Sequence, residues 1–166
     1  SENNKTNDIV NNLINLIALK YENGSNVNNE LLLLQSQNLD GNKQAYIEKL
    51  FIISDKKFIG IEKLQNEFEI LMSNYLIIYY KNKSKNPLVK YLTNFVSIQP
   101  NYDSTFKNDT LKKISIVKEK LDKKEIKSSL IHLANLEDSD SYFKEWILEA
   151  RKYVDFNESL KPFYNS

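Results

Sequence analysis

The spacing of apolar residues restricts this chain to helical folds. Between residues 61 and 78 they recur three and four positions apart, at Ile61, Leu64, Phe68, Leu71, Tyr75 and Ile78. This spacing puts them on one face of an α-helix, so we expect a long helix packed along other helices. The run at 76–80, LIIYY, is apolar on all sides. We expect it either in the centre of the domain or beneath a partner.

Shorter helices are expected before this long one. The first carries an apolar stripe and stops at Asn23 and Gly24, a pair typical of a left-handed helix end. A second helix over 30–37 is expected to end at Asp40 and Gly41, and a third covers 46–53. The stripe of the first helix consists of Ile9, Val10, Leu13, Leu16 and Ile17.

After the long helix, residues 81–85 read as a basic loop. Asn86 and Pro87 supply a cap and a first-turn proline for a helix over 88–96, and 100–104 read as a linker. Three further helices are expected near 109–121, 126–134 and 143–154, with helix caps at 138–141.

These patterns predict an all-α fold of about eight helices and no strand. Residues 1–166 are expected to form a single domain, because a chain of 166 residues with 41% hydrophobic content can bury a substantial core. The architecture expected is a bundle of stacked helical hairpins in the style of tetratricopeptide proteins, but without a repeat of fixed period.

Composition argues against several classes of function. Twenty-three basic residues balance 22 acidic ones, so the net charge does not favour nucleic acid. The absence of cysteine excludes a disulfide framework, a thiolate nucleophile and a cysteine zinc site. His132 is the sole histidine, and the acidic cluster at 137–140 lacks the glycine and the final glutamate of a calcium loop. We therefore expect no catalytic residue, no cofactor and no metal, and a protein that is not an enzyme.

The sole tryptophan and the sole arginine lie five residues apart on the last predicted helix, so they should point to different sides. Trp146 is interpreted first as a core anchor. Arg151 is expected either to pair with Glu119, Asp122 or Asp155 or to contact a partner as an interface residue. The candidate partner-binding residues are Trp146, Arg151, Tyr153, Tyr79 and Tyr80.

Eight lysines lie between residues 107 and 127. Solvated helix faces account for them, and the functional alternative is weak contact with anionic lipid headgroups. The candidate lipid-contact residues are Lys112, Lys113, Lys120, Lys123 and Lys124.

The terminal segment, residues 118–155, resembles the C-terminal signature of the mitofilin family, including its α-proteobacterial members. Members of that family end in a leucine-rich helix, a turn and a tryptophan helix with an alanine-arginine pair. A glycine-aspartate turn usual in the family is replaced here by Lys123, Lys124 and Glu125. The matching positions are Leu121, Ile126, Leu130, Leu133, Leu136, Trp146, Ile147, Ala150, Arg151 and Val154.

This resemblance implies the C-terminal part of a longer protein, with a membrane anchor and a coiled coil upstream. The domain itself would be soluble, on the periplasmic face of the bacterial inner membrane. It would act by self-association or by binding a protein partner, in membrane shaping and in contact between inner and outer membranes. The alternative is a soluble, tetratricopeptide-like adaptor that binds a peptide or protein partner.

Overall fold

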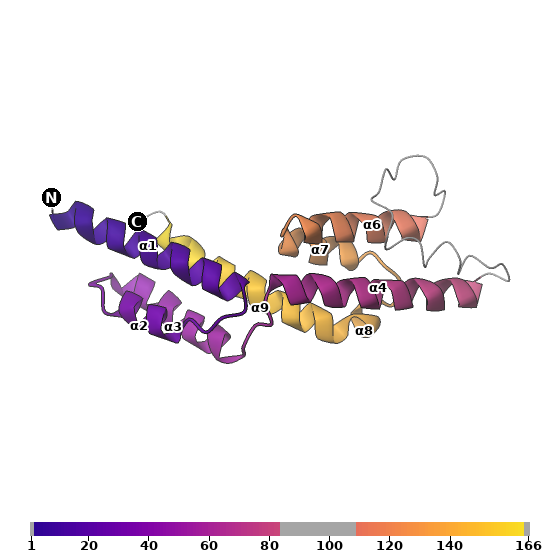
Figure 1. Ribbon diagram of the computed structural model, residues 1–166, viewed down its shortest axis with the longest axis horizontal. Coiled ribbons are helices and arrows are strands. Elements are labelled where there is room, and N and C mark those ends of the chain that lie inside the picture. The colour runs from indigo at the N-terminus through magenta and orange to yellow at the C-terminus, as the bar shows by residue number, and fades with distance from the viewer. Residues whose placement is uncertain (1, 84–108, 165–166) are drawn as a thin grey trace. The chain divides into compact units, whose positions relative to one another are not determined.

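The computed structural model describes residues 2–83 and 109–164, and within these ranges the chain is all-α (Figure 1). The described residues contain eight α-helices, one short 3₁₀ helix and no strand, which confirms the predicted fold class. The helices are α1 (Glu2–Glu22), α2 (Asn28–Gln35), α3 (Gly41–Asp55), α4 (Ile61–Lys83), α6 (Asp109–Asp122), α7 (Ile126–Leu133), α8 (Ser139–Tyr142), α9 (Lys144–Leu160) and η1 (Lys161–Phe163).

Several predicted boundaries differ from those of the structure. The predicted helix over 88–96 and the linker at 100–104 lie outside the described residues. The predicted basic loop at 81–85 was wrong in its first part, because α4 continues through Lys83. Asp40 does not end the second helix: it caps α3, and its side chain accepts a 3.0 Å hydrogen bond from the Lys43 backbone N–H.

The chain groups into two compact units. Unit 1 contains Ser1–Glu62 and Glu149–Ser166, and unit 2 contains Lys63–Leu148. The expected terminal hairpin at 118–155 is therefore divided between the units after Leu148. The prediction of a single domain stays a prediction.

Unit 1 is built around an aromatic cluster. Tyr21 of α1 stacks on Phe156 of α9 with ring centroids 3.6 Å apart, and it also stacks on Phe58 at 5.2 Å. Tyr153 also packs against Phe58, with ring centroids 5.6 Å apart. Stacked aromatic rings bury large apolar areas, so this cluster joins α1 to the C-terminal part of α9.

The core face of α1 is rotated from the predicted stripe. Val10 and Ile17 are buried as expected, together with Ile14 and Tyr21. Ile9 and Leu16 are 52% and 44% exposed, so their assignment to the core stripe was wrong. Apolar residues cover so much of the circumference of α1 that spacing alone does not select the buried side.

Two glycines allow the α1–α2 turn and the α3–α4 loop to approach each other closely, one from each segment. Gly24 and Gly60 have φ values of +75° and +96°, which L side chains rarely adopt. A Cβ on Gly24 would lie 2.8 Å from the backbone of Ile59. The predicted stop at Gly24 is confirmed, because its N–H bonds the carbonyl of Tyr21 and the N–H of Ser25 bonds that of Lys20.

Unit 2 packs α6, α7, α8 and the first turn of α9 against α4 (Figure 1). The buried face of α4 includes Leu64, Phe68, Met72 and Tyr75, whereas Ile78 is 49% exposed. Trp146 is 2% exposed, and its ring lies 5.0 Å from that of Phe68. The spacing of apolar residues therefore identified α4 and most of its core face correctly.

Among the helices that the structure describes, none is both long enough and apolar enough to span a bilayer.

Candidate functional site

A pocket of about 420 Å³ lies in unit 2 between α4 and the turn that joins α7 to α8. Three tyrosines line it together with an aliphatic side chain, a serine and two carboxylates. Its volume falls within the roughly 300–1,000 Å³ that ligand pockets occupy. The described lining residues are Tyr75, Ile78, Tyr79, Glu137, Asp138, Ser141 and Tyr142.

The tyrosine rings form a continuous aromatic wall. Tyr75 and Tyr79 lie one helical turn apart on α4, and their rings stack with centroids 6.0 Å apart. Tyr142 of α8 meets Tyr75 edge to face at 5.3 Å. Burial raises the pKa of the Tyr142 hydroxyl, so this ring is a neutral phenol at physiological pH.

Hydrogen bonds fix the turn against this wall. The Tyr75 hydroxyl donates to the backbone carbonyl of Glu137 at 2.7 Å, which joins α4 to the turn. Ser141 Oγ donates to the carbonyl of Asp138 at 3.0 Å. Asp138 adopts a left-handed backbone with φ of 57°, and its carboxylate does not cap α8. The turn therefore holds both acidic residues beside the rings in a defined conformation.

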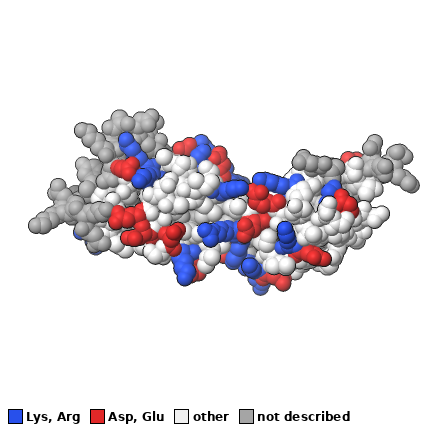
Figure 2. Space-filling model, turned by 180° about the vertical axis from the view of Figure 1, so that it is seen from behind, with Lys and Arg blue, Asp and Glu red and all other residues white. Residues whose placement is uncertain are grey.

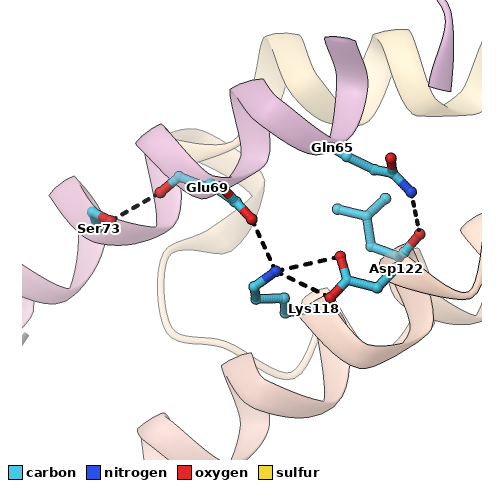
Figure 3. A network of polar contacts seen from close by, with 6 residues as sticks. Gln65, Glu69, Ser73, Lys118 and Asp122 are labelled. Carbon is cyan, nitrogen blue, oxygen red and sulfur yellow. Dashed lines mark hydrogen bonds and ion pairs between the residues drawn. The ribbon is translucent and has the colours of Figure 1, made fainter. Parts of the chain in front are cut away.

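A polar network ties α6 to α4 elsewhere in unit 2 (Figure 3). Lys118 Nζ lies 2.9 Å from a carboxylate oxygen of Glu69 and 3.0 Å from one of Asp122. Gln65 donates to the carbonyl of Leu121 at 3.0 Å. Burial acts to lower the pKa of Lys118, but the hydrogen bonds that its ammonium group donates to both carboxylates outweigh this effect, and the pKa is raised. This arrangement fastens two helices and presents no reactive group.

The five predicted partner-binding residues are not brought together on one surface. Trp146 is buried, and its indole N–H donates to the carbonyl of Leu64 at 2.8 Å, so it is a core anchor and not a contact residue. Tyr80 is 4% exposed, so its assignment to a contact surface was also wrong. Its hydroxyl has no hydrogen-bond partner among the described residues, and burial raises its pKa to about 12. Tyr79 alone of the five lines the pocket.

The remaining two predicted contact residues lie in unit 1. Arg151 is exposed on α9, and Tyr153 is half-buried beside Phe58. Trp146 is buried whereas Arg151 is exposed, which agrees with their spacing on α9. A contact role for Arg151 stays a prediction.

The candidate lipid-contact lysines are largely paired with neighbouring carboxylates. Lys113 pairs with Asp109 at 2.9 Å, Lys120 with Glu125 at 2.9 Å and Lys123 with Glu119 at 2.6 Å. Lys112 is exposed, and Lys124 occupies a left-handed turn position with φ of 61°. On the face that Figure 2 presents, basic and acidic side chains are intermixed. Pairing of this kind weakens attraction to an anionic surface.

Sequence reasoning missed six of the seven pocket residues. Asp138 was interpreted only as a cap, Glu137 only as a member of the acidic cluster at 137–140, and Tyr75 only as a core residue of the long helix. One signal was available: Tyr75 and Tyr79 lie four residues apart and so share a face of α4. Nothing in the sequence placed Tyr142 beside them, because this contact joins positions 67 residues apart in the chain (142 minus 75).

No group of three or more histidine, cysteine or carboxylate side chains that could hold a metal occurs among the described residues. No family model, no curated protein and no solved structure matches this chain.

Proposed function

We propose that this chain is a non-catalytic protein-interaction domain of a mitofilin-like membrane-organising protein. It binds a protein partner or a second copy of itself, and it belongs on the periplasmic face of the bacterial inner membrane. The membrane role and the location rest on the terminal resemblance alone. The interaction role has structural support.

The tyrosine pocket is the observation that carries the interaction role. Proteins bind other molecules in concave sites where apolar walls are combined with a few placed polar groups. In unit 2 an aromatic wall faces a turn that carries two carboxylates, and the bond between Tyr75 and Glu137 fixes the wall to the turn. A site held in this way loses little conformational entropy when a partner segment enters.

The residues that carry the resemblance have a different role. Leu121, Ile126, Leu133 and Trp146 are each at most 2% exposed. These four residues hold the helices together, and none of the matching positions lines the pocket. Four pocket residues, Glu137, Asp138, Ser141 and Tyr142, lie within the segment 118–155 but between the matching positions. Partner recognition is therefore assigned to residues other than those that carry the resemblance.

Selection from a phage-displayed library of random peptides tests the interaction role. The complete chain serves as bait, beside Tyr142→Ala and Tyr164→Ala variants. Tyr142 lines the pocket, whereas Tyr164 is a 52% exposed tyrosine of unit 1 and is the matched control. We expect enriched peptides to bind wild type and Tyr164→Ala equally and to lose most of their affinity for Tyr142→Ala. Equal binding to all three proteins, or no enrichment, would contradict the proposal.

A further inference from the structure

We infer that the tyrosine pocket of unit 2 accepts a basic side chain, arginine or lysine, presented by an extended segment of a partner protein. This inference rests on the proposed interaction role and specifies the chemistry of the partner.

The aromatic wall favours a cation. The faces of aromatic rings carry negative electrostatic potential, and a guanidinium or ammonium group within about 6 Å of a ring centroid is attracted to it. Tyr79 of α4 and Tyr142 of α8 are both half-buried and bring two such rings to the pocket, whereas Tyr75 is 5% exposed and packs against both of them. Arginine in particular can stack its planar group on a ring while its N–H groups point outward.

The charges at the pocket act in the same direction. Asp138 is an exposed residue of the turn that lines the pocket, and the described lining includes no lysine or arginine. An anionic segment would be repelled by this carboxylate, and an uncharged apolar segment would gain nothing from it. A cation gains from the aromatic rings and from Asp138 together.

The size of the pocket favours a side chain on a polypeptide over a free small amine. About 420 Å³ leaves room around a single cationic group for its aliphatic stem and for neighbouring backbone. Ile78, 49% exposed at the pocket, offers an apolar surface for such a stem. A small quaternary ammonium ion would fill only part of this space.

The test uses the complete chain and three probes. They are a short peptide with one arginine between glycines and serines, the same peptide with the neutral isostere citrulline, and tetramethylammonium chloride. Binding is followed by the amide NMR shifts of Ser141 and Tyr142. We expect the arginine peptide to bind about tenfold more tightly than the citrulline peptide, and its affinity to fall with added salt.

Two variants test whether the pocket carboxylate of Asp138 contributes to binding of the arginine peptide. Asp138→Asn removes a pocket carboxylate, and Asp140→Asn removes an exposed carboxylate two residues away that does not line the pocket. We expect a several-fold loss of affinity for the arginine peptide in the first and none in the second. Identical affinities in both variants, equal binding of arginine and citrulline peptides, or binding of tetramethylammonium as tight as that of the arginine peptide would overturn the inference.

Failure of this inference can be distinguished from failure of the proposed interaction role. Displayed peptides that depend on Tyr142 but contain no basic residue would overturn the basic-side-chain inference and leave the interaction role intact. If no peptide binding depends on Tyr142, both the basic-side-chain inference and the proposed interaction role are overturned.

Discussion

The indole N–H of Trp146 donates a 2.8 Å hydrogen bond to the backbone carbonyl of Leu64, 82 residues earlier in the chain. The indole ring is buried against Phe68. The bond therefore fixes the first turn of α9 against the beginning of the unit 2 part of α4.

Replacing Trp146 by phenylalanine should destabilise the protein by about 2–3 kcal/mol. The variant loses one buried hydrogen bond, worth about 1 kcal/mol, and leaves a cavity where the larger ring was packed. Urea unfolding followed by circular dichroism measures the change. Leu148→Ala on the same helix is the control, since Leu148 is 48% exposed and its truncation should cost no more than about 0.5 kcal/mol. Equal effects of the two changes would contradict the anchoring role.

Alanine at Gly24 should lower the free energy of unfolding by at least about 2 kcal/mol. The new Cβ would meet the Ile59 backbone at 2.8 Å in a conformation that alanine adopts only with strain. Gly41→Ala is the matched control, because nothing lies within 4 Å of a Cβ there. Thermal unfolding compares the two variants. A Gly24→Ala protein as stable as Gly41→Ala would show that the two backbones do not approach closely.

Lys118→Met should lower the free energy of unfolding by about 1 kcal/mol near neutral pH, because Glu69 and Asp122 lose their shared cation. The pKa of Lys118 is raised above its ordinary value of 10.5, so its contribution is complete below pH 10.5 and is lost as the pH rises through the folded-state pKa. The stability difference between wild type and variant should therefore shrink in strongly alkaline buffer. Lys123→Met, which breaks an exposed pair with Glu119, should leave the unfolding midpoint unchanged at neutral pH. A pH-independent difference for Lys118→Met would exclude the ionic role.

The Lys124→Gly variant should have a free energy of unfolding about 1 kcal/mol higher than that of the Lys124→Ala variant. Lys124 has a φ of 61° in the turn between α6 and α7, where a side chain costs conformational energy that glycine avoids. Both substitutions remove the lysine side chain, so their difference isolates the backbone. Chemical denaturation of the pair measures it, and equal midpoints would contradict the left-handed assignment.

The sequence predicted the helices well because apolar spacing reports helical periodicity directly. The C-terminal end of α4 and the start of α3 were predicted less accurately from the sequence. Asp40 was interpreted as a stop although its side chain caps the next helix, since cap and stop residues overlap in type. The left-handed turn at Lys124 gave no signal, because lysine is not a residue that marks such a conformation.

Most of the candidate site could not be predicted from the sequence. Tyr79 was selected for its place in an apolar run, yet the neighbouring Tyr80 is buried. Helical spacing assigns residues to a face but does not say which helix covers that face. The pocket depends on α8 coming beside α4, and that is a tertiary contact between distant segments.

The most direct test of the interaction role is an NMR titration of the complete chain with the most strongly enriched displayed peptide. We predict that the amide signals of Tyr79, Ser141 and Tyr142 shift most and reach saturation together. The largest shifts around Arg151 and Tyr153, with the pocket residues unmoved, would contradict the assignment of binding to the tyrosine pocket.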